Sequence, residues 1–325
     1  MLHIEEIINC LEKKHVYIQT HNFPDPDAVS SAYGMHELLK KYGIDSTICY
    51  KGKIDRYSMV RLIDYLDVNI VNLDMLSSIE VTDEIILVDS QQGNVNLVDL
   101  AGNKVISIDH HPTFEKVDYR YSDIRPEVGA CASIVASYFV EAGIPVDEKT
   151  ATALMYGIKI DTANLSRGVS QLDLDMFYKL YWSANQDMLN KMGRSEIQFN
   201  DLRAYANAIR NIKIFDNISI AHTGEDCPES LIASISDFML SLSEVDCSIV
   251  YSLRQDGIKL SVRSCDPNID SGKIANLALR GIGSGGGHQS MAGGFVPFPP
   301  ELDNIERFIH AMEERFMEEI LKTSK

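Results

Sequence analysis

Short runs of β-forming residues alternate with helical patterns along the first part of the chain. The expected strands are 16–20, 46–50, 84–88 and 104–108, and the expected helices are 4–14, 28–42, 130–142, 148–160 and 172–192. The runs 84–88 and 104–108 are nearly all apolar, which is typical of strands that are covered on both faces of a parallel sheet. Residues 51–72 show no clear periodicity. The alternation predicts an α/β domain with a doubly wound, mainly parallel sheet.

The rest of the chain has a different pattern. Residues 195–211 are polar and compatible with a helix, so we expect a helical connector there. Beyond it, the expected strands are 218–223, 247–254 and 258–263, and the expected helices, 272–280 and 302–321, flank a glycine-rich loop. Gln255-Asp256-Gly257, between two of these strands, is typical of a β-hairpin. We therefore predict an α/β domain at 1–194, the connector at 195–211, and a smaller α+β domain at 212–325.

Composition and charge narrow the range of partners. The chain has 325 residues, of which 45% are hydrophobic, as is ordinary for a globular protein of two domains. Its 30 basic and 47 acidic residues give a formal net charge of −17. Such a chain repels polyanions, so we expect it to bind neither duplex DNA nor anionic membranes. A small anionic substrate is still compatible with this charge, because a buried metal ion locally outweighs the negative potential of the rest of the protein.

Cysteine usage and the absence of targeting signals favour a cytoplasmic protein. The six cysteines are scattered without a C-x-x-C pair, which favours reduced thiols over disulfides or a zinc ribbon. The first residues lack a basic region followed by an apolar one, and no apolar run approaches the ~18 residues that span a bilayer. We therefore expect a soluble protein of the cytoplasm.

The segment His21-Asn22-Phe23-Pro24-Asp25-Pro26-Asp27 concentrates reactive side chains between an expected strand and an expected helix. It holds one imidazole and two carboxylates. Loops at the carboxyl ends of strands in an open α/β sheet are where ligands bind. A simpler interpretation makes Asp27 a helix N-cap and leaves His21 and Asp25 as turn and surface residues.

Other expected strands are also followed by aspartate or histidine residues, which weakens the simpler interpretation. Asp89 and Asp109-His110-His111 follow two further strands, and Asp161 follows another apolar stretch. Five carboxylates and at least two imidazoles would then meet at one rim and would repel one another without a cation. Oxygen and imidazole ligands without thiolate favour Mn²⁺ or Mg²⁺ over structural zinc. The set is large enough for two ions about 3.5–4 Å apart, the arrangement that clamps a displacement at phosphorus.

These motifs resemble the DHH phosphoesterase family over nearly the full chain. The family takes its name from the triplet at 109–111, and its first motif, H-x-x-P-D-x-D-A, stands at 21–28. Asp89 in V-D-S and Asp161 in G-I-K-I-D-T match two further motifs.

The resemblance implies a role for each residue of the motifs. Asp109 would orient an imidazole, and His111 would protonate the departing oxygen. Two Mn²⁺ ions are the implied cofactors, with Mg²⁺ or Co²⁺ as substitutes, and Asp89 would bridge them. The ligands of one ion would be His21, Asp25 and Asp89, and those of the other would be Asp27, Asp89, His110 and Asp161.

The glycine-rich segment 283–294 contains G-G-G-H-x-x-x-A-G and resembles the DHH-associated C-terminal domain of RNA- and nucleotide-cleaving members. Glycine lets backbone N–H groups approach an anion, although such a run alone is equally compatible with a flexible turn. The two candidate arginines have alternatives as well, a surface salt bridge for Arg263 and a solvated loop position for Arg167. The expected substrate-binding residues are Arg263, Gly285, Gly286, Gly287, His288 and Arg167.

The resemblance is strongest to the compact nanoRNase and pAp-phosphatase branch of the family, which implies an active site in the cleft between two domains. We predict that a metal-activated water hydrolyses di- and very short oligoribonucleotides to mononucleotides. Phe23, Pro26 and 91–93 depart from the branch, which leaves two rivals open: a 3′-phosphatase acting on pAp, and a phosphodiesterase for cyclic di-AMP or linear dinucleotides. An alternative of another class is a metal-stabilised nucleotide sensor without turnover. A homodimer is the expected assembly.

Overall fold

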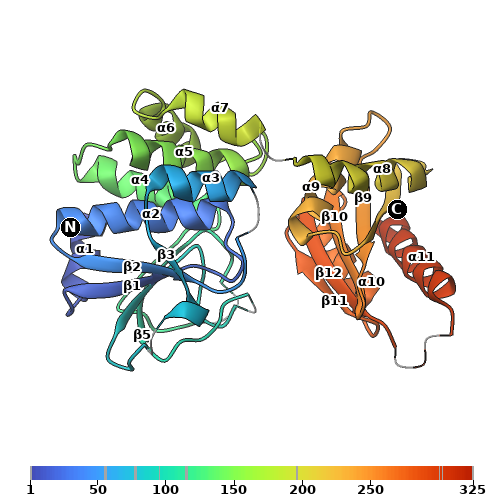
Figure 1. The fold of residues 1–325 in the computed structure, drawn as a ribbon, viewed down its shortest axis with the longest axis horizontal. Helices are drawn as coiled ribbons and strands as arrows, with labels where there is room; N and C mark the ends of the chain where they lie inside the picture. The colour runs from blue at the N-terminus through green and yellow to red at the C-terminus, as the bar shows by residue number, and fades with distance from the viewer. Residues whose placement is uncertain are drawn as a thin grey trace. The chain divides into compact units, whose positions relative to one another are not determined.

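The computed structural model describes residues 2–54, 57–76, 79–94, 96–113, 116–194, 197–299, 301 and 303–323. The chain forms two compact units, Met1–Glu196 and Ile197–Lys325 (Figure 1). Ser195 and Glu196, where the predicted connector begins, lie outside the described residues, and its remainder, 197–211, belongs to the second unit. Over the described ranges, no helix combines the length and apolar character that crossing a membrane requires.

A parallel sheet forms the centre of the first unit. Its strands are β1 (His15–Gln19), β2 (Asp45–Tyr50), β3 (Ile70–Asn72), β4 (Glu84–Val88), β5 (Asn103–Asp109) and β6 (Tyr121–Ile124). They lie in the order β3-β2-β1-β4-β5-β6, and each neighbouring pair is parallel. β4 is buried along its whole length, as its apolar sequence predicts. The predicted fold class, α/β with a mainly parallel sheet, is confirmed for this unit. The strand order reverses between β1 and β4, where open sheets of this type bind ligands.

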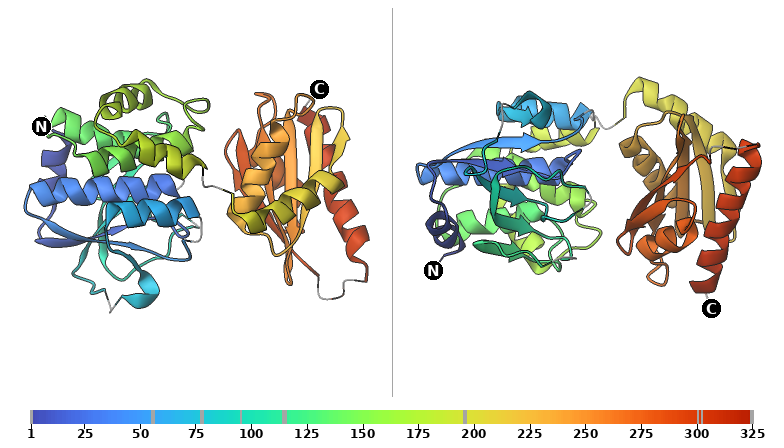
Figure 2. Two further views of the ribbon diagram at one scale, coloured as in Figure 1. Left: turned by 45° about the horizontal axis from the view of Figure 1, so that its top comes forward. Right: turned by 90° about the horizontal axis from the view of Figure 1, so that it is seen from below.

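Helices cover this sheet. They are α1 (His3–Cys10), α2 (Pro26–Lys41), α3 (Tyr57–Leu66), α4 (Cys131–Glu141), α5 (Glu148–Asp161), α6 (Gln171–Tyr181) and α7 (Gln186–Arg194), with a short 3₁₀ helix, η1 (Leu73–Met75). α2, α4 and α5 pack against one another on one side of the sheet (Figures 1 and 2). Gly34 permits this close approach, because a Cβ there would lie 2.8 Å from the side chain of Leu154 and 2.9 Å from that of Val135.

Several elements of the first unit differ from the sequence prediction. Because residues 51–72 show no clear periodicity, α3 and β3 are missed, and the short edge strand β6 is missed as well. The predicted helix 172–192 is two helices, because Asn185 starts a new one by accepting the N–H of Met188 at 2.9 Å. The first helix ends at Cys10 rather than near residue 14, because the Glu84 carboxylate accepts the N–H groups of Glu12 and Lys13, each at 2.9 Å. The end of the first helix is thus set by a contact distant in sequence, and the start of α7 is set by a local cap.

A mixed sheet forms the centre of the second unit. Its strands are β7 (Lys213–Phe215), β8 (Ile218–Glu225), β9 (Cys247–Leu253), β10 (Gly257–Ser264), β11 (Ser284–Gly287) and β12 (Met291–Pro297), in the order β11-β12-β10-β9-β8-β7. β8 and β9 are parallel, and the other neighbours are antiparallel, including the predicted hairpin of β9 and β10.

Two separate cores lie on the two faces of this sheet. η2 (Phe199–Asp201) precedes α8 (Leu202–Asn211), which packs with α9 (Glu229–Leu240) over a core that includes Val250. α10 (Ser271–Leu279) and α11 (Ile305–Thr323) pack over the core that holds Ile249 and Tyr251. The alternation along β9 places consecutive side chains in opposite cores. The predicted α+β class is confirmed. Leu302, the predicted start of the last helix, lies outside the described residues.

The glycine-rich segment is a hairpin, and the prediction of a loop there is wrong. β11 and β12 pair in antiparallel, with Gly285 opposite Gly294 and Gly286 opposite Gly293. The hairpin packs directly on α10, since a Cβ on Gly285 would lie 3.0 Å from the carbonyl oxygen of Ala275. Close backbone packing therefore explains glycine at this position, and a sequence alone does not distinguish it from an anion-binding loop.

Candidate metal centre

Three adjacent strands position His21, Asp89 and residues 109–111 of the predicted site. β1, β4 and β5 are neighbours in the sheet. His21 lies two residues beyond β1, and Asp89 directly follows β4. Asp109 is the last residue of β5, with His110 and His111 next in the chain. Because parallel strands end at the same edge of a sheet, these side chains share one rim.

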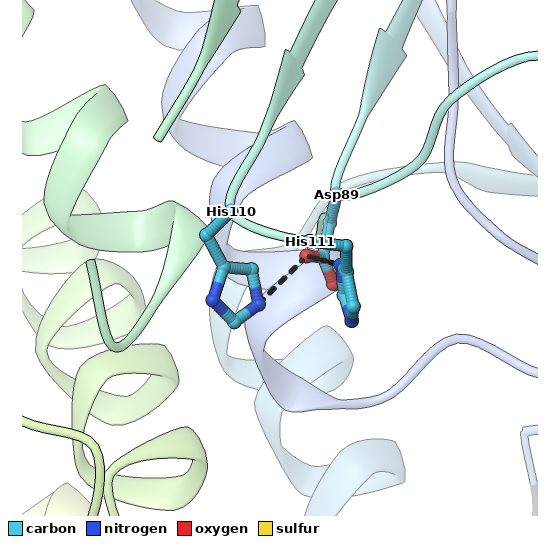
Figure 3. A group of neighbouring side chains, drawn as sticks. All are labelled: Asp89, His110 and His111. Atoms are coloured by element: carbon cyan, nitrogen blue, oxygen red, sulfur yellow. Dashed lines mark ion pairs between the residues drawn. The ribbon is translucent and has the colours of Figure 1, made fainter. Parts of the chain in front are cut away.

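Asp89 lies at the centre of this rim and is 2% exposed. Its Oδ1 lies 3.4 Å from His110 Nε2 and 3.6 Å from His111 Nδ1 (Figure 3). Its Oδ2 lies 3.6 Å from His21 Nε2. The φ angle of Asp89 is +57°, and its N–H donates to the carbonyl of Ile108 at 2.9 Å. Such strained backbone persists only where the surroundings hold it, and it clusters at functional sites.

Two helix ends supply further carboxylates. Asp25 is the N-cap of α2 and accepts the N–H of Ala28 at 3.0 Å. Its Oδ1 lies 3.9 Å from His21 Nε2. Asp161 is the last residue of α5, and its Oδ2 lies 3.2 Å from His110 Nε2. Asp25 thus reaches the rim from the N-terminal end of α2, and Asp161 reaches it from the C-terminal end of α5.

Asp27 is completely buried and is fixed by the start of α4. Its Oδ2 accepts the N–H of Cys131 at 2.6 Å, and its Oδ1 accepts that of Ala132 at 2.9 Å. α4 has no side-chain cap of its own, so this carboxylate satisfies the positive end of the helix. Asp27 Oδ2 also lies 3.9 Å from His110 Nε2. The simpler interpretation of Asp27 as the cap of its own helix is wrong, because Asp25 has that role.

His21 and His110 turn the same ring nitrogen toward the carboxylates. Nδ1 of His21 lies 2.9 Å from the carbonyl oxygen of Asn22, and Nδ1 of His110 lies 3.1 Å from that of Val128. A carbonyl can only accept, so Nδ1 carries the proton and Nε2 keeps its lone pair in the neutral ring. This is the tautomer that a metal-binding histidine of this orientation requires.

Asp109 anchors the turn after β5 and is fully buried. Its Oδ1 accepts the N–H of His110 at 2.8 Å and lies 2.8 Å from His111 Nδ1. Its Oδ2 accepts from the amide of Gln91 at 2.8 Å. The contact with His111 orients that ring. Residues 91–93 depart from the branch in sequence, and the structure shows that Gln91 supports the buried Asp109 carboxylate.

Burial and neighbouring charges shift the pKa values of this cluster. Burial, together with the charges of Asp89 and Asp161, raises the pKa of Asp27 well above its usual range. Burial also acts to raise the pKa of Asp89, but the imidazoles of His110 and His21 outweigh it and lower the pKa. Burial acts to lower the pKa of His110, but Asp161 and Asp89 outweigh it and raise the pKa well above its usual value.

The donor set fits a divalent cation. Asp89 Oδ1 and His110 Nε2 are buried without a hydrogen-bond partner among the described residues, as expected for atoms that bind a ligand. The ion pairs that described residues form with this carboxylate cluster involve imidazoles rather than lysine or arginine. Oxygen and imidazole donors suit Mn²⁺ and Mg²⁺. Three groups have ligand atoms within 4.8 Å of one another: Asp89, His110 and His111; His21, Asp25 and Asp89; and Asp27, His110 and Asp161.

A buried carboxylate that the sequence analysis misses holds the segment behind the site. Asp173, in the first turn of α6, accepts the N–H of Gly129 at 2.9 Å and the hydroxyl of Ser133 at 2.5 Å. Val128, next to Gly129, supplies the carbonyl that contacts His110. Cys131 and Ala132, between Gly129 and Ser133, supply the N–H groups that bind Asp27. The sequence signal of Asp173 is a capping pattern, which predicts a helix start and says nothing of this contact.

The predicted substrate residues lie apart from this cluster in the sequence, in both units. Arg167 lies half-buried in the turn that follows α5. Arg263, in β10, donates from Nε to Asp237 Oδ1 at 3.0 Å, the kind of ion pair that the alternative interpretation expects. Residues 285–287 belong to β11, and His288 is exposed in the turn after it. Their role in substrate binding stays a prediction.

Comparisons with known proteins agree with this geometry. Residues 15–158 match the N-terminal domain of the DHH family, and residues 215–318 match the DHHA1 domain. The uncharacterized protein MJ1633 of Methanocaldococcus jannaschii is 31% identical over 287 residues, which cover 88% of this chain and 59% of that protein. The cyclic-di-AMP phosphodiesterase GdpP of Bacillus subtilis is 25% identical over 334 residues, which cover 96% of this chain and 49% of GdpP. The chain thus spans between half and three-fifths of the length of these relatives.

A solved structure shows the same fold. An exopolyphosphatase-related protein from Bacteroides fragilis matches with a TM-score of 0.79 at 17% identity, covering 99% of this chain and 98% of that one. The two domain models match in the same order as the two compact units. From the motifs at the rim and the two domain matches, we conclude that the chain contains a DHH-family N-terminal domain followed by a DHHA1 domain.

Proposed function

We propose that this chain is a metal-dependent phosphoesterase that hydrolyses di- and very short oligoribonucleotides to mononucleotides. One observation carries the proposal: Asp89 belongs both to the ligand group of His21 and to that of His110. A carboxylate shared between two ligand groups is the arrangement used by two-metal hydrolases. The DHH-family N-terminal domain supports phosphoester chemistry, and the relative named a cyclic-di-AMP phosphodiesterase supports a nucleotide substrate.

Two Mn²⁺ ions are the proposed cofactors, with Mg²⁺ or Co²⁺ as substitutes. When bound, such ions polarise a phosphoryl oxygen and acidify water at neutral pH. The residues proposed to hold one ion are His21, Asp25 and Asp89, and those proposed for the other are Asp27, Asp89, His110 and Asp161.

We assign proton transfer to His111 and its orientation to Asp109. Burial acts to lower the pKa of His111, but the hydrogen bond with Asp109 and the charge of Asp89 outweigh it and raise the pKa. A raised pKa keeps the ring protonated closer to neutral pH, which suits the donor of a proton to the departing oxygen. The contacts of Asp27 and His110 with the α4 segment keep these ligands oriented, so they need little rearrangement during reaction.

Substrate binding is assigned to side chains and backbone of both units. The Arg263 guanidinium presents a fork that matches phosphate geometry. The net charge of −17 disfavours a long polyanion, which supports a short substrate over long RNA. The other residues in this assignment are Arg167, His288 and 285–287.

The test is incubation of the purified chain with Mn²⁺ and pApA, pGpG, pAp or cyclic di-AMP, with products resolved by chromatography. We expect pApA and pGpG to be converted to AMP and GMP fastest. The Asp89→Asn variant, purified in the same way, controls for contaminating hydrolases. If all four nucleotides stay intact with Mn²⁺, Mg²⁺ and Co²⁺, the proposal fails and the sensor without turnover takes its place.

A phosphodiesterase for cyclic di-AMP is the second candidate. It is favoured by the match to GdpP, which extends over 96% of this chain. Cyclic di-AMP consumed at least ten times faster than pApA would identify this activity. Release of inorganic phosphate from pAp as the dominant reaction would instead identify the 3′-phosphatase.

A further inference from the structure

Phe23 is an exposed aromatic residue within the loop that carries His21 and Asp25. The residue is 66% exposed, so it adds little to the core of the first unit. Its φ angle is +55°, in a region that a bulky residue rarely adopts. Strain of this kind at a candidate active site is a reason to look for a function.

The backbone on both sides of Phe23 is held in place. The Phe23 N–H donates to the carbonyl of Lys51 at 2.7 Å. The N–H of Asn22 donates to the carbonyl of Asn96 at 2.6 Å, and the Asn22 side chain accepts the N–H of Val98 at 3.1 Å. These bonds tie the loop to two other segments, so the backbone that carries the Phe23 side chain is held in position.

Gly52 lies directly beneath the ring. A Cβ at Gly52 would lie 2.6 to 2.8 Å from three ring carbons of Phe23, so the ring contacts the glycine backbone itself. Gly52 has a φ angle of +102°, and its carbonyl accepts from the amide of Asn72 at 2.7 Å. One side of the ring therefore rests on a fixed turn, while the residue as a whole remains exposed to solvent.

We propose that Phe23 is a platform on which a nucleobase of the substrate stacks, an inference that rests on the proposed function. A flat, immobilised ring with an open side matches the π-surface that every base presents. Stacking on an aromatic side chain strengthens binding by about 5- to 150-fold per base. Phe23 is two residues from both His21 and Asp25, so a base on this ring would neighbour a phosphate bound at the rim. A sugar phosphate or an inorganic polyphosphate has no surface to stack, so the ring selects substrates that carry a base.

The test compares the affinity for AMP with that for ribose 5-phosphate, measured by calorimetry in the presence of Mn²⁺. The two ligands share the ribose phosphate and differ in the base. We expect the intact chain to prefer AMP, Phe23→Ala to reduce this preference at least 5-fold, and Phe23→Tyr to keep it within about 2-fold. Tyr178→Ala is the matched control, because Tyr178 is an aromatic residue of similar exposure, 69%, on α6.

The outcomes separate this inference from the proposed function. An unchanged preference for AMP in Phe23→Ala would overturn the platform even if the chain cleaves dinucleotides. An equal loss in Phe23→Ala and Phe23→Tyr would also overturn it, because the loop rather than the ring would be responsible. A chain that cleaves none of the nucleotides but loses its AMP preference in Phe23→Ala alone would keep the platform and overturn the proposed function.

Discussion

Asp89 combines burial, charge and a left-handed backbone in one residue. It contacts His21 on one side and His110 and His111 on the other. Asparagine tolerates positive φ as well as aspartate does, so Asp89→Asn removes the charge and keeps the backbone. The residue is therefore suited to a substitution that separates chemistry from folding.

We predict that Asp89→Asn lowers the Mn²⁺-dependent hydrolysis rate more than tenfold. The reason is that the variant removes the negative charge shared by both ligand groups. The rate with pApA is the measurement. Asp67→Asn is the matched control, because Asp67 has a φ angle of +55° and lies away from the motifs. A variant that retains a tenth of the rate or more would contradict the shared-ligand scheme.

We predict that Arg263→Ala raises KM for pApA more than it lowers kcat. A guanidinium that holds a phosphate contributes to the ground state and to the transition state alike, and its loss then weakens binding. Lys259→Met, on the same strand, controls for the loss of a positive charge from β10. A fall in kcat at unchanged KM would argue against this role.

At the scale of elements, the start of α4 connects the sheet edge to the helical layer. Its first N–H groups bind Asp27, and the loop before it contacts His110. Asp173 of α6 holds this segment from behind. The orientation of two ligands thus depends on the packing of α4 and α6.

We predict that Asp173→Ala weakens Mn²⁺ binding by up to about 10-fold, the lower end of the effect of losing a direct partner of a metal ligand, because Asp173 acts on Asp27 and His110 only through the α4 segment. Bound Mn²⁺ is measured by electron paramagnetic resonance on samples whose circular dichroism shows that they are folded. Asp175→Ala, an exposed position on the same helix, is the control. Lower stability with unchanged Mn²⁺ affinity would show that Asp173 serves the fold alone.

The start of α5 offers a prediction about pH. Asp147 is the N-cap of α5 and accepts from the N–H of Thr150 at 3.0 Å and its hydroxyl at 2.9 Å. Partial burial acts to raise the pKa of Asp147, but these bonds outweigh it and lower the pKa. The charged cap therefore stabilises the fold above the ordinary aspartate pKa, and this contribution disappears as the pH falls through the lowered value.

We expect Asp147→Ala to reduce the free energy of unfolding by about 1 kcal/mol at pH 7. Asp147→Asn keeps a cap that does not titrate, so its stability relative to the intact chain should improve as the pH is lowered below about 4. Urea unfolding at several pH values is the measurement. If the stability difference between Asp147→Asn and the intact chain is the same at every pH, charge on the cap plays no part.

At the scale of the whole molecule, each unit has its own hydrophobic core. The candidate metal ligands all belong to the first unit. Ligands that bind only the native state stabilise it in proportion to the logarithm of their concentration. Metal should therefore act on one unit and leave the other unchanged.

We predict that Mn²⁺ at 100 times its dissociation constant stabilises the first unit by about 2.7 kcal/mol. EDTA should reverse the shift and abolish hydrolysis. Scanning calorimetry is the measurement, and the Asp89→Asn variant should show a much smaller shift. An equal response of the intact chain and the variant would place the Mn²⁺ elsewhere.

The amino-acid pattern predicts the four central strands of the first sheet and most of the candidate rim, although not the edge strands β3 and β6. Apolar runs that end in Asp89 and Asp109 predict strands of a parallel sheet, and parallel strands end at one edge. The proximity of His21, Asp89 and His110 follows from that geometry alone. The fold class follows from the same alternation of strands and helices.

The groups that hold the candidate ligands in place become visible only in the folded chain. The bonds from Cys131 and Ala132 to Asp27, and from Gly129 to Asp173, join residues more than forty positions apart, and no local pattern reports them. The pairing of glycine-rich strands likewise depends on the α10 surface beneath them. Local propensity and periodicity act over a few neighbouring residues, whereas these contacts arise only after distant segments pack, which is why the sequence predicts the candidate ligands and the structure reveals the groups that hold them.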